Sequence, residues 1–261
     1  MAWHNVISIK LGAICALWPL IAFAQPVAAP EGDVSKECQT PGVKIVLDRP
    51  LPNTLAALKE RKVIKILTIG ASASAGADPV SGGYQEIIED VLERTVSGLD
   101  VQIIDRGISG ELARDAASRL KTEVALAEPD LVLWQVGTND ALAQIPVEEF
   151  SETVLEAIGW LKEHNVDVVL VGLHYVRNMR ADPHYQTIRA ALARIAETEK
   201  IIRISRYEAM EVIEKMRQAS PSEKFNAFAS TENAYSCMAE YVVRAITSAI
   251  FLKRGSSAPA H

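Results

Sequence analysis

Residues 66–79, ILTIGASASAGADP, decide the fold of this chain, because a short β-branched apolar run passes directly into a turn of Gly, Ala and Ser. Such a run is typical of a buried strand, and the turn after it leads towards a helix. Ser72 lies in this turn. A hydroxyl on a tight turn between a strand and a helix is a candidate nucleophile, provided that another group accepts its proton.

The same alternation of apolar runs and helical periods recurs along the chain. The predicted strands are VIKILTIG, DVQIID, DLVLWQVG, DVVLVGL and IIRIS, and the predicted helices lie near 84–96, 111–126, 147–164 and 184–199. Strands that are apolar at nearly every position, each followed by a helix, indicate a parallel sheet covered on both faces. The sequence therefore predicts a three-layer α/β/α sandwich with a five-stranded parallel sheet.

The first 24 residues resemble a secretory signal peptide, because the apolar run LGAICALWPLIAFA follows Lys10 and ends in small residues. The run has about 14 residues, fewer than the roughly 20 that span a bilayer. We expect cleavage near Ala24 and a periplasmic or secreted protein with no membrane insertion afterwards. Beyond the cleavage site we expect an extended arm with a short helix at 25–62, one domain at 63–252 and a disordered tail at 253–261.

The overall composition suits a globular domain and limits the classes of partner. Hydrophobic residues make up 49% and charged residues 23% of the chain, which is enough apolar material for a substantial core. The net charge is −6, and no Lys/Arg cluster follows the pattern of a groove. Nucleic acid and anionic membrane surfaces are therefore not expected as partners.

The cysteines suggest a covalent link across the domain. Cys15 leaves with the signal peptide, so the mature chain keeps Cys38 and Cys237. An even pair in an oxidising compartment indicates a disulfide, which would tie the arm to the C-terminal helix. Two unrelated buried thiols are the alternative.

Functional groups of a parallel sheet collect on the loops outside the carboxyl ends of its strands. A dinucleotide site would suit Asp105 at the end of the second strand, but the first turn lacks the glycine pattern of such sites. A phosphate loop would need a lysine in that turn, which contains none. His164, His174 and His184 have no metal-ligand spacing with acidic residues. We therefore expect no metal site, and neither nucleotide-binding motif is complete.

Acyl transfer fits the strand ends better than these alternatives. It needs a hydroxyl on a tight turn and N–H donors directed at the developing oxyanion. Ser72 is the candidate hydroxyl, and Gly107 and Asn139 supply candidate donors from the next two strand ends. Each residue also has an ordinary explanation, in a turn, a helix cap or an Asx-turn. Their placement at three successive strand ends favours the catalytic interpretation.

These residues resemble the SGNH, or GDSL-type, hydrolases over about residues 63–252. ILTIGASAS resembles the block with the nucleophile at Ser72, RGISGE the block with the oxyanion glycine at Gly107, and WQVGTND the block with the oxyanion asparagine at Asn139. The resemblance implies a flavodoxin-like sheet, no cofactor, and hydrolysis of acyl esters, often acetyl groups on carbohydrates, by a Ser-His-Asp triad. Exported bacterial members have one cysteine before the domain and one in the last helix. The positions of Cys38 and Cys237 match this arrangement.

The chain departs from the family pattern at two places. Ala71 replaces the usual aspartate of the first block, which is not a triad member. The second departure concerns the catalytic base, because the family carries an Asp-x-x-His block before its final helix. Residues 224–246, KFNAFASTENAYSCMAEYVVRAI, contain neither aspartate nor histidine. The resemblance therefore predicts that the usual base and its orienting acid are missing.

His174, at the end of the fourth strand, is the best candidate for a substitute base, although it would also suit a hydrogen-bonded histidine at a strand end. His184 is expected to begin a helix capped by Asp182, His164 to end a helix, and Asp140 to terminate a loop. Three functions stay open: an exported serine esterase of low turnover on a small-molecule or carbohydrate ester; a pseudoenzyme that binds an acylated glycan or a protein partner; and a nucleotide or small-molecule binder.

Overall fold

The computed structural model describes residues 34–35, 38–46, 49–71, 84–219 and 231–251, which belong to one compact unit spanning Gly32–His261. The predicted signal peptide, the predicted tail, Ser72 and the segment 220–230 lie outside the described residues. The proposed domain limits therefore stay predictions.

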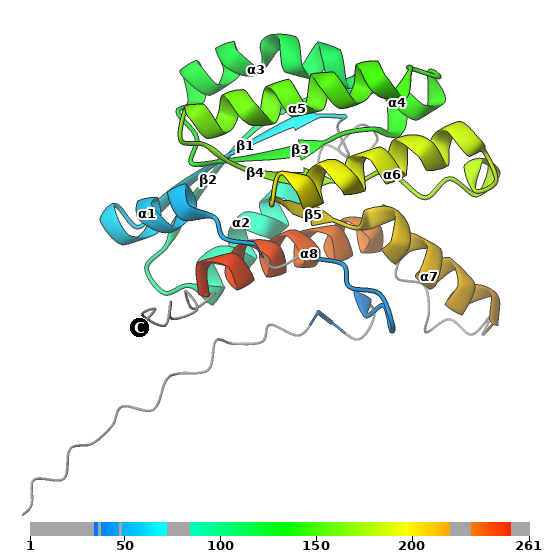
Figure 1. Cartoon of the computed structure of the whole chain (residues 1–261). Helices are drawn as coiled ribbons and strands as arrows, with labels where there is room; N and C mark the ends of the chain where they lie inside the picture. The colour runs from blue at the N-terminus through cyan, green and yellow to red at the C-terminus, as the bar shows by residue number, and fades with distance from the viewer. Residues whose placement is uncertain (1–33, 36–37, 47–48, 72–83, 220–230, 252–261) are drawn as a thin grey trace, which may run out of the picture. The chain divides into compact units, whose positions relative to one another are not determined.

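The chain alternates strands and helices in the predicted order (Figure 1). The strands are β1 (Val63–Gly70), β2 (Asp100–Gly107), β3 (Leu131–Gln135), β4 (Asp167–Val171) and β5 (Ile202–Ile204). The helices are α1 (Pro52–Glu60), α2 (Tyr84–Thr95), α3 (Ala113–Ala127), α4 (Thr138–Leu142), α5 (Val147–Glu163), α6 (Pro183–Thr198), α7 (Arg206–Ala219) and α8 (Thr231–Phe251), with a short 3-10 turn, η2, at Arg177–Met179.

The five strands form one sheet in the order β2-β1-β3-β4-β5, and every neighbouring pair is parallel. This result confirms the predicted α/β fold with a five-stranded parallel sheet. The order is the flavodoxin-like one, in which the direction of winding reverses between β1 and β3. Crevices outside the carboxyl ends of the strands at such a reversal are the usual place for ligands in these sheets.

Helices cover both faces of the sheet (Figure 1), and a separate hydrophobic core lies on each face. Alternate residues of β1 point to opposite faces, so that Ile64 and Ile66 pack with α2 and α8 whereas Leu67 and Ile69 pack with α3, α5 and α6. All five residues of β3 and all five of β4 are buried. Near-continuous apolar strands are expected where helices cover both faces, and this accounts for the three layers.

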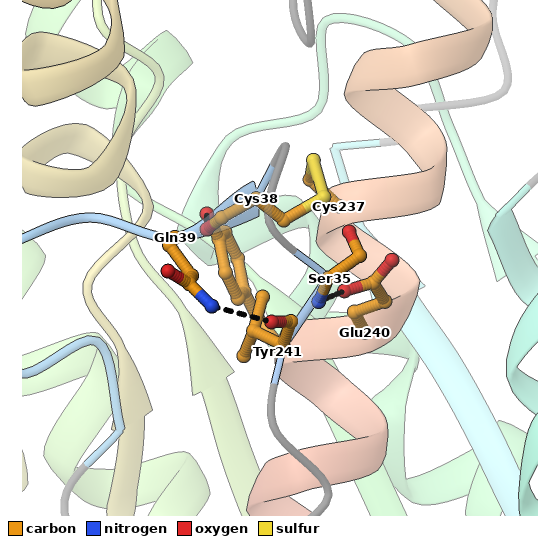
Figure 2. The surroundings of a disulfide bond; sticks show 7 residues. Ser35, Cys38, Gln39, Cys237, Glu240 and Tyr241 are labelled. Carbon is orange, nitrogen blue, oxygen red and sulfur yellow. Dashed lines mark hydrogen bonds between the residues drawn. A yellow bond between two sulfur atoms is a disulfide. The ribbon is translucent and has the colours of Figure 1, made fainter.

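The disulfide predicted between Cys38 and Cys237 is present, and it fastens the arm before α1 to α8 (Figure 2). Beside it, the Tyr241 hydroxyl donates to the Cys38 carbonyl at 2.7 Å and the Ser35 N–H donates to Glu240 at 2.7 Å. Further along the arm, Val46 forms an antiparallel bridge with Ile204. The arm thereby pairs with part of β5, which lies at the edge of the five-stranded sheet.

Helix α7 was not among the predicted helices. It begins directly after β5, and the Ala209 N–H donates to the Ser205 carbonyl at 3.0 Å at its start. Ile213, one turn beyond the buried Ala209, is also buried. Among the described residues, no helix has the length and apolar character needed to span a membrane.

Candidate active site

The carboxyl ends of four strands lie at one level. Gly70, the last residue of β1, pairs with Gly107 on one side and Gln135 on the other, and Gln135 pairs with Val171. The ladder extends one residue further, because the Ala71 N–H donates to the Gln135 carbonyl and the Ile108 N–H to the Gly70 carbonyl, each at 3.0 Å. Ser72 follows Ala71 in the sequence but lies outside the described residues.

Gly70 is the tightest position of this edge. Its φ is +94°, and an ideal Cβ there would lie 2.2 Å from the Gln135 carbonyl oxygen and 2.8 Å from Trp134 Cδ1. Only glycine fits such a backbone conformation at such a distance. The close approach of β1 to β3 therefore depends on the first glycine of the stretch that also contains Ser72.

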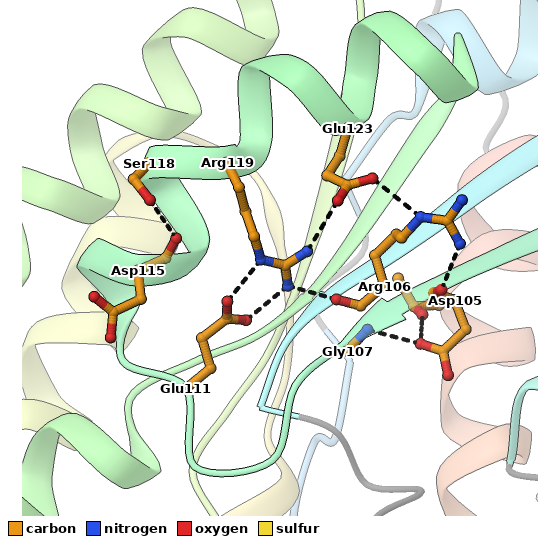
Figure 3. A network of polar contacts seen from close by, with 9 residues as sticks. Asp105, Arg106, Gly107, Glu111, Asp115, Ser118, Arg119 and Glu123 are labelled. Atoms are coloured by element: carbon orange, nitrogen blue, oxygen red, sulfur yellow. Dashed lines mark hydrogen bonds and ion pairs between the residues drawn. The ribbon is translucent and has the colours of Figure 1, made fainter.

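Gly107 uses its backbone donor within the fold. The Gly107 N–H donates to Asp105 Oδ1 at 3.0 Å, and the same oxygen accepts from the Thr68 hydroxyl at 2.6 Å (Figure 3). An N–H already paired with a carboxylate is a poor donor to a substrate oxyanion. The structure thus places Gly107 at the expected strand end, but its N–H is engaged by Asp105.

Gly110, which the sequence interpretation passed over, occupies a more open position in the same turn. Its φ is +80°, and nothing lies within 4 Å of an ideal Cβ there. The Asn139 side-chain amide donates to the carbonyl of the next residue, Glu111, at 2.9 Å. Asn139 is therefore joined to the 110–111 end of the turn. The sequence signal was present in RGISGE, which contains two glycines, of which the interpretation chose the first.

Asn139 lies at the second position of α4, and the neighbouring Asp140 has a structural role. The Asp140 carboxylate accepts from the Ala113 N–H at 2.9 Å, at the first residue of α3, whose own N-cap, Leu112, makes no side-chain cap hydrogen bond. Burial raises the pKa of Asp140, although hydrogen bonds from backbone N–H groups oppose the rise. The expectation that Asp140 terminates a loop is therefore wrong, because Asp140 lies within α4 and its carboxylate caps the start of α3.

His174 lies beside this site but has its own partner. Its backbone N–H donates to the Thr138 hydroxyl at 2.9 Å, next to Asn139, and its carbonyl accepts from the Tyr185 hydroxyl at 2.6 Å. The ring Nε2 is hydrogen-bonded to the Arg206 guanidinium, so this nitrogen must be the acceptor. Burial, together with the charge of Arg206, lowers the pKa of His174 to about 3.

The pairing with Arg206 weighs against His174 as a general base. An effective base needs a free lone pair and a pKa near the working pH. The Nε2 lone pair of His174 is used by Arg206, and the remaining ring nitrogen then carries the proton. His174 therefore has the properties of a structural histidine at a strand end, which was the alternative reading of this position.

The other two candidate histidines lie at helix ends, as expected. His164 follows the last residue of α5, and its Nδ1 lies 2.8 Å from the Trp160 carbonyl oxygen. His184 lies in the first turn of α6, whose N-cap Asp182 accepts from the Tyr185 N–H at 2.7 Å. No group of three or more His, Cys, Asp or Glu residues with metal-binding geometry occurs in the part of the chain that the structure describes.

Comparison with known protein families shows to which family the chain belongs. Residues 37–251 match the Non-GDSL lipase-like family, which covers the arm, the sheet and the final helix. Among curated proteins, an arylesterase from Vibrio mimicus is 30% identical over 122 residues, which are 46% of this chain and 57% of that protein. An acetylxylan esterase from Geobacillus stearothermophilus is 23% identical over 116 residues, 41% of this chain and 53% of that protein. The matches thus span just over half the length of these relatives.

Solved structures share the fold. A lipase/acylhydrolase from Enterococcus faecalis superposes with a TM-score of 0.57 at 23% identity, covering 70% of this chain and 95% of that one. A catalytic mutant of the Geobacillus acetylxylan esterase, in which a histidine is replaced by alanine, gives a TM-score of 0.56 at 20% identity, covering 73% and 95%. At these identities the likeness extends to the fold and no further.

Proposed function

Because this chain belongs to the Non-GDSL lipase-like family, we propose that it is a serine ester hydrolase with Ser72 as its nucleophile. One observation carries the proposal. The Ile108 N–H bonds to the Gly70 carbonyl, and the Asn139 amide bonds to the Glu111 carbonyl, so the turn after β2 is hydrogen-bonded both to the end of β1 and to α4, which follows β3. Ser72 follows Gly70 by two residues in the sequence, and this proximity along the chain supports Ser72 as the nucleophile at this edge of the sheet.

The proposed chemistry is attack of the Ser72 oxygen on the acyl carbonyl carbon. The carbonyl oxygen becomes an oxyanion, and the alcohol leaves with a proton; water then releases the acid and restores Ser72. Asn139 Nδ2 carries two hydrogens, one of which is bound to Glu111, so the other is a donor for the oxyanion. A backbone N–H of the 107–110 turn would be the second donor, and the open position of Gly110 favours it over Gly107.

We further propose that turnover is slow. Residues 224–246 contain no aspartate or histidine, and His174 is paired with Arg206. The catalytic mutants of the Geobacillus acetylxylan esterase replace a histidine in one case and an aspartate in another. Serine hydrolases without a triad member keep only the part of catalysis that oxyanion donors and binding provide, about 10³–10⁴ over water.

Two exposed apolar side chains favour an apolar acyl or aryl group in the substrate. Ile108, which is 51% exposed, lies in the turn that bonds to Gly70, and Leu142, which is 49% exposed, lies one helical turn after Asn139. Ligand pockets are lined mainly by apolar and aromatic side chains around a few polar groups. The arylesterase among the relatives agrees with this preference, and an acetylated carbohydrate is the alternative that the acetylxylan esterase supports.

Export is also part of the proposal. The disulfide between Cys38 and Cys237 supports it, because disulfides persist mainly in oxidising compartments. The residues that resemble a signal peptide, 1–24, would be removed on export.

The second candidate function is a pseudoenzyme that binds an acylated glycan or a protein partner without turning it over. The observation that favours it is the neutral, arginine-bound His174, which leaves Ser72 without a base on that side. A flavodoxin-like sheet with oxyanion donors but no base would still hold an ester carbonyl. Binding without hydrolysis is the expected behaviour in that case.

A fluorophosphonate probe on residues 25–261 separates the two candidates. A hydrolase labels at Ser72, and the label is lost in Ser72→Ala but kept in His174→Gln. If the serine has no activating histidine, as we propose, the labelling rate should rise continuously from pH 6 to 9 without a plateau near neutrality. Hydrolysis of an aryl ester compared with an acetylated xylo-oligosaccharide then identifies the substrate. Absence of labelling, with retained binding of the acetylated oligosaccharide, would establish the pseudoenzyme.

A further inference from the structure

A buried ion pair lies directly behind the turn that contacts Asn139. The side chain of Glu111 is 3% exposed, and it accepts two hydrogen bonds from Arg119 of α3, from Nε at 2.7 Å and from Nη2 at 2.8 Å (Figure 3). Two parallel N–H donors of one guanidinium fix a carboxylate in both distance and orientation. The hydrogen bonds with Glu111 raise the pKa of Arg119, which is therefore a permanent cation.

Arg119 also contacts the end of β2. Its Nη2 donates to the carbonyl of Arg106, the residue before Gly107, and its Nη1 lies 3.4 Å from Glu123. Glu123 in turn accepts from Arg106 Nε at 3.0 Å. One guanidinium on a long helix thus contacts both ends of the 106–111 segment (Figure 3).

The position of Glu111 determines the position of the candidate donors. Its carbonyl accepts from Asn139, and its N–H donates to the Ile108 carbonyl at 3.2 Å, which closes the turn. The Ile108 N–H is bound to Gly70, two residues before Ser72. A displacement of Glu111 would therefore move the turn relative to both Asn139 and the end of β1.

We propose that Arg119 is a positioning residue, which holds the 108–111 turn and Asn139 in the arrangement that accepts the oxyanion. The inference rests on the proposed ester hydrolysis at the same site. Arg119 does not touch the substrate; it acts through Glu111. Oxyanion donors contribute to catalysis only when they are oriented before the charge develops, and a shift of about 1 Å removes much of the effect.

Loss of the arginine would disturb the turn for a clear electrostatic reason. A carboxylate left buried without its partner is strongly disfavoured, so Glu111 would turn towards water. Because the Glu111 carbonyl accepts the hydrogen bond from the Asn139 amide, that movement would break the contact between the turn and α4. Replacing both partners removes the unpaired charge, and we expect the double variant Glu111→Gln/Arg119→Met to be less disturbed than the two single variants together predict.

The test compares Arg119→Gln and Arg119→Lys with a control on the same helix, Arg114→Gln. Arg114 is exposed, and its nearest carboxylates, Asp115 and Glu149, are 3.7 Å and 3.4 Å away. We expect Arg119→Gln to lower kcat for an aryl ester by about ten-fold or more with KM within about two-fold. Arg119→Lys, which keeps the charge but not the paired geometry, should fall between it and wild type. Arg114→Gln should leave both constants unchanged.

Hydrogen exchange of the 108–111 amides provides a readout that does not depend on turnover. We expect these amides to exchange about ten-fold faster in Arg119→Gln and at the wild-type rate in Arg114→Gln. If wild type does not hydrolyse esters, the proposed function fails, while exchange still decides whether Arg119 orders the turn. Unchanged exchange and unchanged kcat in Arg119→Gln would overturn the proposal. A fall in kcat equalled by Arg114→Gln would overturn it as well.

Discussion

The two halves of the sheet edge use their polar groups differently. On the β1–β3 side, Asn139 keeps one amide hydrogen beyond the one that binds Glu111, and Gly110 lies in an open turn. On the β4–β5 side, His174 has hydrogen bonds at its N–H, its carbonyl and its ring Nε2. One half thus has candidate donors for a ligand, whereas the histidine of the other half is already paired within the fold.

This difference bears on what the site can do. Stabilising an oxyanion needs fixed donors, and the proposed donors, Asn139 and the 108–111 turn, both belong to the β1–β3 side. Activating a serine needs a base with an accessible lone pair, which His174 does not offer. The described part of the edge is thus better suited to hold an ester carbonyl than to deprotonate a nucleophile.

The largest loss of stability is expected from Gly70→Ala, a substitution on the β1–β3 side of the sheet edge. The new Cβ would meet the Gln135 carbonyl at 2.2 Å, and the φ of +94° would strain any other residue. Overpacking and backbone strain together should lower the free energy of unfolding by about 4 kcal/mol. Urea unfolding followed by circular dichroism measures the loss.

Gly110→Ala is the matched control for Gly70→Ala. Its φ is similar, at +80°, but nothing lies within 4 Å of the added atom, so only the strain of about 1 kcal/mol remains. Equal losses for the two variants would contradict the view that close packing between β1 and β3 fixes the strand ends.

The next largest effect is the pH dependence of stability that His174, on the β4–β5 side, contributes. The pKa of His174 is lowered from 6.5 to about 3, so the unfolded chain binds a proton at this residue in a range where the folded chain does not. Stability from the neutral His174 is complete above pH 6.5 and is lost as the pH falls towards 3. Between pH 7 and 5, wild type should lose about 2 kcal/mol more than His174→Gln.

Urea titrations of both proteins at several pH values test this prediction. The difference between wild type and His174→Gln isolates the histidine, because all other groups titrate in both proteins. Parallel curves would mean that His174 is solvated in the folded state and is available as a base after all.

The fold could be predicted from the sequence because it depends on local signals. The runs of β3 and β4 are apolar at nearly every position, and each is followed by a periodic helix, so a covered parallel sheet was the consistent solution. Helix α7 was missed because only Ala209 and Ile213 mark its buried face after Tyr207. The pairing of Cys38 with Cys237 followed from the count of cysteines and from the family resemblance.

The site was less predictable because its partners lie on different elements. Which residue occupies the lone pair of His174 depends on Arg206, 32 positions later, and no local pattern reports that contact. The pairing of Glu111 with Arg119 likewise depends on the path of the turn that joins β2 to α3. The choice between Gly107 and Gly110 required knowing that Asp105 takes up the first N–H.

The smallest expected effect concerns Asp140, which follows Asn139 in α4 on the β1–β3 side. Asp140→Ala removes the acceptor for the Ala113 N–H at the start of α3 and should lower the free energy of unfolding by about 1 kcal/mol. Asp140→Asn keeps an acceptor oxygen and loses the buried charge, so at pH 7 its stability should be within about 1 kcal/mol of wild type or higher.

The pH dependence of Asp140→Asn should be opposite in sign to that of His174→Gln. Burial raises the pKa of Asp140 above 3.8, so the folded chain binds this proton more tightly than the unfolded chain does. The cost of the buried charge is therefore present at neutral pH and disappears as the pH falls. During acidification, the free energy of unfolding of wild type should rise relative to that of Asp140→Asn. If wild type instead loses stability relative to Asp140→Asn, the carboxylate is stabilised by its backbone donors more than burial disfavours it.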